Sequence, residues 1–225
     1  MSAKLMSTGL PRTICYLGAL AMLCLQINVS HAQPAVPLAP NGGGFIAGGL
    51  PELTLTPLNL ITSINIPFSS TSFSGILTSS VYGNDTSNPF GVGSLTFTYQ
   101  YSINTGPDSS EGISLGGFSG FHTDVTYQAP TTGVPPILDS RSLNGNNIEF
   151  NFIPQITPGM TSALLIVQTD SQVFNVGTAT VLDNTGSPNV AILAPGAVVG
   201  VPEPTSAGFI LLGLGVLASA RRFRK

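Results

Sequence analysis

Leu95-Thr96-Phe97-Thr98-Tyr99-Gln100-Tyr101-Ser102-Ile103 is the stretch that decides the fold class. Its apolar side chains occupy every second position, and polar side chains fill the positions between them. Only an extended chain places all of these apolar groups on one face, because a helix would scatter them around its circumference. The stretch therefore predicts a β-strand that is buried on one face only. We interpret its aromatic rings as core and not as a platform for a ligand.

Shorter segments on both sides of this stretch share its extended pattern, and turn-forming residues separate them. Pro67 restricts its own strand to an edge or an end of a sheet, and the apolar run 163–167 predicts a strand buried on both faces. The sequence thus predicts an all-β fold, an antiparallel β-sandwich of about nine to eleven short strands. The expected strands are 53–56, 63–68, 73–82, 95–103, 113–115, 125–127, 147–152, 163–167, 173–176, 178–182 and 190–193.

The segment from residue 33 to residue 200 has an uneven charge balance. It holds nine acidic residues and one base, Arg141, which gives a net charge of −8, whereas the whole chain has −3. One cation cannot neutralise a row of phosphates, so nucleic-acid binding is excluded, and so is attraction to anionic lipid surfaces. Both cysteines, Cys15 and Cys24, precede this segment, so we expect an apolar core without disulfides to stabilise it.

The N-terminal residues have the parts of a secretory signal peptide. Lys4 and Arg12 precede the apolar stretch 14–25, and small residues follow at Ser30 and Ala32. Small side chains with this spacing suit signal peptidase, so we expect cleavage after Ala32 and export of the remaining chain.

The C-terminal residues combine a proline-rich turn, an apolar run and a basic end. Pro202-Glu203-Pro204 precedes the uncharged run 205–220, and four cations follow the run: Arg221, Arg222, Arg224 and Lys225. As a helix the run reaches about 24 Å, slightly less than the hydrocarbon core, and arginine side chains extend to the headgroups. A buried terminal helix is the alternative, but such a helix does not require a basic end. We predict a transmembrane helix with its basic tail in the cytoplasm.

This order of parts resembles the C-terminal sorting signal of the PEP-CTERM family of bacterial exported proteins. The resemblance implies that an exosortase, a membrane cysteine transpeptidase, processes the chain near the Pro-Glu-Pro motif. It also implies that Pro202, Glu203 and Pro204 are the recognised residues and that the basic end retains the chain in the membrane. Phe223 interrupts the basic run without changing its charge.

These signals predict six regions in the chain. They are a signal peptide (1–32), a flexible segment (33–49), a β-sandwich domain (50–195), a tether that carries Pro-Glu-Pro (196–204), a transmembrane helix (205–220) and a cytoplasmic basic tail (221–225).

The residues available for catalysis are few. The exported segment has one histidine, His122, and the nearby Ser119 lacks the glycine spacing of a nucleophile elbow. Two carboxylate pairs, Asp108 with Glu111 and Asp124 with Asp139, are candidates for glycan hydrolysis, but the chain has no tryptophan to stack on sugars. Spaced carboxylates in loops are usually solvated, so we expect no enzyme.

Calcium is the one cofactor for which the sequence offers ligands. Asp85, Asp108 and Glu111 lie in polar loops and supply the oxygen ligands that a hard cation prefers. The loops do not have EF-hand spacing, and such side chains also occur in turns because they bond the backbone. No cofactor is therefore required, and calcium stays as an alternative.

The leading functional hypothesis is a non-enzymatic exported protein of the cell surface or the extracellular matrix. Its tail would anchor it in the inner membrane until processing by the exosortase, and extracellular polysaccharide is a candidate partner. The alternative is a module for calcium-dependent adhesion or for glycan binding.

Overall fold

The computed structural model describes residues 37–46, 59–129, 132–183 and 186–197, which belong to one compact unit, Pro34–Lys225. These residues form strands and turns without a helix of any length. The strands are β1 (Gly43–Phe45), β2 (Leu60–Ser69), β3 (Ser74–Tyr82), β4 (Thr96–Thr105), β5 (Ser110–Gly116), β6 (Thr123–Tyr127), β7 (Pro136–Arg141), β8 (Asn147–Ile156), β9 (Leu165–Thr169), β10 (Val173–Leu182) and β11 (Asn189–Gly196).

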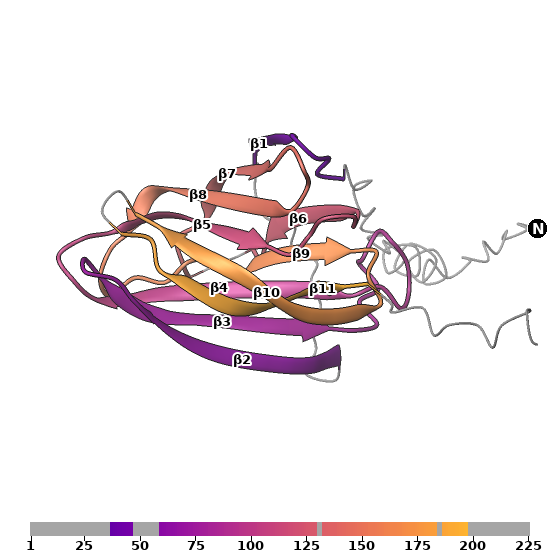
Figure 1. The fold of residues 1–225 in the computed structure, drawn as a ribbon, viewed down its shortest axis with the longest axis horizontal. Coiled ribbons are helices and arrows are strands. Elements are labelled where there is room, and N and C mark those ends of the chain that lie inside the picture. Colours follow the sequence, from indigo (N-terminus) through magenta and orange to yellow (C-terminus); the bar gives the residue numbers. More distant parts are fainter. Residues whose placement is uncertain (1–36, 47–58, 130–131, 184–185, 198–225) are drawn as a thin grey trace, which may run out of the picture. The chain divides into compact units, whose positions relative to one another are not determined.

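The strands form two antiparallel sheets (Figure 1). The six-stranded sheet has the order β1-β7-β8-β5-β10-β11, and the five-stranded sheet has the order β2-β3-β4-β9-β6. One core of buried apolar side chains takes residues from both sheets. The prediction of an all-β antiparallel sandwich is therefore confirmed.

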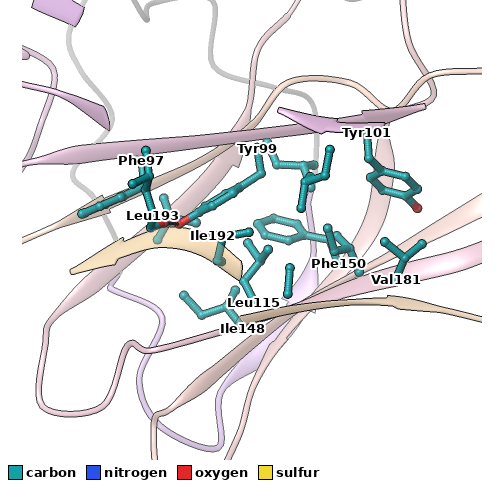
Figure 2. Packing of buried hydrophobic residues seen from close by; sticks show 14 of the residues in the cluster. Phe97, Tyr99, Tyr101, Leu115, Ile148, Phe150, Val181, Ile192 and Leu193 are labelled. Carbon is teal, nitrogen blue, oxygen red and sulfur yellow. Dashed lines mark hydrogen bonds between the residues drawn. The ribbon is translucent and has the colours of Figure 1, made fainter. Parts of the chain in front are cut away.

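The core is built on the apolar face of β4. Phe97, Tyr99 and Tyr101 are at most 1% exposed. Figure 2 shows them pointing toward Leu115, Phe150 and other side chains of the six-stranded sheet. The Tyr101 ring meets Phe152 edge-on, with 5.9 Å between the ring centroids. Such edge-to-face contacts add to the free energy gained by removing the rings from water.

The opposite face of β4 differs from the prediction of one exposed face. Thr96 and Thr98 are also buried, and the Asn88 side chain from the loop after β3 donates to the Thr96 hydroxyl. Thr96 donates to Asp85, so the cover is polar. The alternation of the sequence located the inner face correctly but did not indicate that the outer face is covered.

Two predictions about the positions of strands in the sheets are confirmed. Pro67 lies in β2, which is an edge strand of the five-stranded sheet, where a missing N–H costs no ladder hydrogen bond. All five residues of β9 are buried, as expected for the run 163–167, although the strand begins and ends two residues later.

Other boundaries differ from the predictions. The connection between the strands predicted at 95–103 and 113–115 is shorter than expected, because β4 extends to Thr105 and β5 begins at Ser110. The strand β7 was not predicted, since it begins with a proline and does not alternate. The strands predicted at 173–176 and 178–182 are one strand, β10. Gly177 lies at its middle, and a Cβ there would stand 2.4 Å from the Gly116 carbonyl oxygen and 2.5 Å from the Ala194 Cβ.

The predicted flexible segment 33–49 is docked where the structure describes it. Leu38 is 9% exposed, and its N–H donates to the Thr123 carbonyl group of β6 at 2.7 Å. Gly43–Phe45 then pairs with β7. A Cβ at Gly43 would lie 2.6 Å from the Asp139 carbonyl oxygen, so glycine permits this close pairing.

The outer edge of β11 is closed by side chains from the opposite sheet. The Tyr99 hydroxyl donates to the Leu193 carbonyl oxygen at 2.6 Å, and the Leu193 N–H donates to Ser79 Oγ at 3.1 Å. Full burial raises the pKa of Tyr99 well above its ordinary value, so the hydroxyl keeps its proton. These two bonds satisfy backbone groups that an edge strand would otherwise leave unpaired inside the protein.

Within the described residues, no helix is long and apolar enough to span a membrane. The predicted signal peptide (1–32), the transmembrane helix (205–220) and the basic tail all lie outside the described residues, as does the expected strand at 53–56.

Candidate functional site

The structure does not bring a catalytic triad together around His122. The exposed His122 ring stacks on Phe90, and its backbone N–H donates to the Asp170 carboxylate at 3.0 Å. The Ser119 hydroxyl donates instead to the Asn144 carbonyl oxygen at 3.4 Å. Each of these side chains is thus engaged in holding a turn.

Asp85 lies in the loop after β3, whereas Asp108 and Glu111 lie together where β4 is connected to β5. In the described part of the chain, no three acidic, histidine or cysteine side chains gather as metal ligands. The Glu111 carboxylate accepts from the Gln155 amide at 3.2 Å, and Asp108 accepts from the Ser109 N–H at 2.9 Å.

Asp85 is the centre of a buried hydrogen-bond network. Its carboxylate is 5% exposed and accepts from the Ser87 N–H and hydroxyl, the Thr96 hydroxyl at 2.6 Å and the Gln168 amide at 3.0 Å. Burial raises the pKa of Asp85, but these hydrogen bonds outweigh it and leave the pKa below its ordinary value of 3.8. These four hydrogen bonds from the domain itself explain why this acid is in the loop.

Arg141 is the second buried charge. Its guanidinium is 4% exposed and makes five hydrogen bonds to neutral acceptors. The acceptors are Gly145 O at 3.0 Å, Leu38 O and Thr123 Oγ1 at 2.9 Å, and Phe118 O and Phe121 O at 2.8 Å. Burial lowers the pKa of Arg141, while the charge of Asp170 opposes that shift, and an arginine stays protonated in any case. The only base of the exported segment therefore fastens the N-terminal segment, the 118–121 loop and the β7–β8 turn together.

Asp124 lies in β6 of the five-stranded sheet and Asp139 in β7 of the six-stranded sheet, and the two carboxyl groups are close enough for the charge of Asp139 to act on Asp124. Burial, followed by the charge of Asp139, raises the pKa of Asp124 from 3.8 to about 6. Burial also raises the pKa of Asp139, which accepts from the Gly44 N–H at 2.9 Å. Neither member of this pair lines the hollows described below.

Asp124→Asn is expected to raise the melting temperature of the protein near neutral pH. The raised pKa means that the native carboxyl group favours its neutral form, so its stabilising contribution is present below pH 3.8 and is lost as the pH rises through about 6. Removing the charge should gain about 1 kcal/mol, after allowance for partial exposure, or about 2–4 °C. Thermal unfolding at about pH 8 and about pH 4, followed by near-UV circular dichroism of the tyrosines, measures this change in melting temperature. An equal gain at both pH values would contradict the assignment, and the Asp139→Asn background should reduce the gain.

The outer face of the six-stranded sheet carries two hollows of about 360 Å³ each. They share Ser114 and Asn147, so they lie next to one another across β10, β5, β8 and β7, and we call the pair the polar trough. The first hollow is lined by Ser114, Gly116, Gly117, Asn146, Asn147, Val176, Gly177, Thr178 and Thr180. The second is lined by Asn41, Gly42, Ser114, Ser140, Arg141, Ser142, Asn147 and Glu149.

The strand register explains the shape of the polar trough. Ser114 of β5 lies opposite Thr180 of β10 on one side and Glu149 of β8 on the other. Gly116 lies in the same way between Thr178 and Asn147. The floor along β5 is thus made of the smallest side chains, with longer polar side chains on both flanks. This site was not predicted, although the alternation of small polar with apolar residues along Gly112–Gly116 could have indicated it.

Comparison with known proteins identifies one region of the chain. The family model of the PEP-CTERM protein-sorting motif matches residues 200–225. No curated protein and no solved structure matches the chain significantly. The matched residues include Pro202, Glu203, Pro204 and the basic end, which lie outside the described residues. The chain therefore carries the PEP-CTERM protein-sorting motif, the C-terminal signal of an exported protein that is addressed to an exosortase.

Proposed function

We propose that this protein is a non-enzymatic component of the cell surface or the extracellular matrix. In this proposal the signal peptide directs it across the inner membrane, the helix 205–220 anchors it, and an exosortase then processes the tail near Pro-Glu-Pro. The observation that carries the proposal is the sorting motif over residues 200–225.

The composition and side-chain contacts of the domain support the non-enzymatic part of the proposal. Its single histidine stacks on Phe90, and the Ser119 hydroxyl is engaged elsewhere. The buried Asp85 and Arg141 are saturated with hydrogen bonds from and to their own domain. A general base or nucleophile must reach a substrate, and neither of these buried groups is placed to do so.

Glu203→Gln is expected to leave export intact and to block processing of the tail. The change keeps the size of the side chain but removes its charge, and a site built for a carboxylate discriminates strongly against such an analogue. In a host with an exosortase, the fraction of chains that lose residues 205–225 should fall by about tenfold or more. Mass spectrometry of the membrane fraction and the medium measures that fraction.

Glu111→Gln is the matched control, because it makes the same change within the folded domain. Its processing should equal that of the wild type. The proposal fails if the Glu203→Gln chain is processed at the wild-type rate, or if both chains accumulate in the cytoplasm.

A further inference from the structure

We propose that the polar trough binds a neutral, hydroxyl-rich polysaccharide. This inference rests on the proposed function for the location of the protein outside the cytoplasm, and it names the chemical class of its partner. The trough runs across four strands, which corresponds to three inter-strand spacings or about 14 Å. It is therefore long enough for a segment of an extended polymer, and each hollow has the size of a small ligand pocket.

The side chains of the trough suit a ligand with many hydroxyl groups. Asn147, Thr178 and Ser114 each provide a donor and an acceptor. Glu149 provides acceptors only, and so does Thr180, because its hydroxyl already donates to Asn189 Oδ1. Sugar hydroxyls likewise donate and accept, so they can pair with such groups in either direction. No aromatic side chain lines either hollow, so binding must come from hydrogen bonds along a chain of sugars, and we expect it to be weak for a single sugar.

The walls are held in place before any ligand arrives. The Asn146 amide donates to Asn147 Oδ1 at 2.7 Å, and the Asn146 N–H donates to Asn144 Oδ1 at 3.0 Å. The Ser142 hydroxyl accepts from the Asn147 N–H at 2.8 Å and donates to Asn144 Oδ1. These bonds make the β7–β8 turn a fixed unit, so little side-chain entropy is lost when a ligand binds.

Glycine keeps the floor of the trough open. A Cβ at Gly116 would lie 3.2 Å from Asn147 Oδ1, 3.3 Å from the Thr178 carbonyl oxygen and 3.6 Å from Asn146 Nδ2. The backbone of Gly116 does not have the positive φ that would itself require glycine. The absence of a side chain therefore maintains space between the walls and is not needed for the turn of the chain.

The charge of the domain selects the class of polysaccharide. The segment 33–200 has a net charge of −8. The guanidinium N–H groups of its single base, Arg141, donate to carbonyl groups of the domain itself. Glu149 adds a negative charge to the trough wall. An acidic polysaccharide would be repelled without a cation to meet it, so the ligand that fits is neutral.

The test uses the full chain in mild detergent and native gels that contain a neutral glucan (dextran), a galactomannan or the acidic polysaccharide alginate. We expect at least one neutral polymer to retard the wild type, and alginate to have no effect. Ser114→Tyr places a ring in both hollows and should weaken binding by about tenfold or more. Gly116→Ala should weaken it in the same direction by a smaller factor.

Ile76→Tyr is the matched control, since it introduces the same ring on the exposed outer face of β3 in the other sheet. It should bind like the wild type. The proposal is overturned if neither neutral polymer retards the wild type, if alginate alone does so, or if Ser114→Tyr binds normally. If Ser114→Tyr does not fold, Gly116→Ala and Asn147→Ala decide the question. Processing of the tail should be normal in all of these variants, so failure here is distinct from failure of the sorting proposal.

Discussion

Arg141→Met is expected to destabilise the domain by about 3–5 kcal/mol, the largest effect that we anticipate for a single substitution. Methionine fills much of the same volume but donates no hydrogen bonds. The carbonyl groups of Gly145 and Phe121 would lose the guanidinium as donor, while those of Leu38 and Phe118 would keep only the Thr123 hydroxyl and the Phe121 N–H. Each buried unsatisfied carbonyl group costs about 1–3 kcal/mol, and relief from burying a charge returns part of the total.

Denaturant unfolding of the full chain, followed by near-UV circular dichroism of the tyrosines, measures this loss, since the chain has no tryptophan. Leu143→Met is the control, because it introduces methionine at an exposed position of the same β7–β8 turn and should cost less than about 0.5 kcal/mol. Arg141→Lys should recover little, since an ammonium group cannot span acceptors that a planar guanidinium reaches. A loss below about 1 kcal/mol for Arg141→Met would show that water replaces the guanidinium.

Asp85→Asn is expected to destabilise the domain by about 2–3 kcal/mol at neutral pH. The amide group has one acceptor oxygen where the carboxylate has two, and its NH₂ would face the donors of Thr96 or Gln168. The polar cover of β4 depends on these contacts. Because Asn88 also bonds to the Leu95 and Thr169 carbonyl oxygens, the damage should stay within this cover and leave the core packed.

The effect of Asp85→Asn should depend on pH. The lowered pKa means that the contribution of Asp85 is complete above the ordinary value of 3.8 and is lost as the pH falls through the lower native value. The difference in unfolding free energy between wild type and variant should therefore shrink on going from about pH 7 to about pH 3. A difference that is constant over this range would refute the charged network, whereas Thr86→Ala, at the exposed neighbouring position, should behave like the wild type throughout.

The parts of the fold that were predictable are those in which one face of a strand decides its sequence. The alternation 95–103 identified the inner face of β4, and Pro67 placed β2 at an edge. The strand β7 was missed because its burial comes from neighbours on both sides and not from alternation. Gly177 suggested that the chain breaks between two strands, but β10 is continuous there. A glycine occupies this position because Ala194 and Gly116, which lie far away in the sequence, approach its backbone closely.

The sites show a similar division. The sorting motif is local in sequence, so Pro202-Glu203-Pro204 and the basic end could be identified from their order alone. Arg141 was noted as the one base of the exported segment, but its burial depends on four carbonyl groups from separate loops. The polar trough depends on the register between three strands, which no short stretch of sequence specifies.

The closed edge of β11 has a mechanical consequence. β11 is the last strand in the described part of the chain, so a pull on a retained tail would enter the described fold at Gly196 and along this strand. Eight residue pairs join β11 to β10, and the side chains of Tyr99 and Ser79 form hydrogen bonds to the Leu193 backbone on its other side. Tension along the strand axis loads these bonds in shear, where they must give way together and not one after another. A domain held by its tail against moving fluid would therefore be attached through a strand that is bonded along both of its sides.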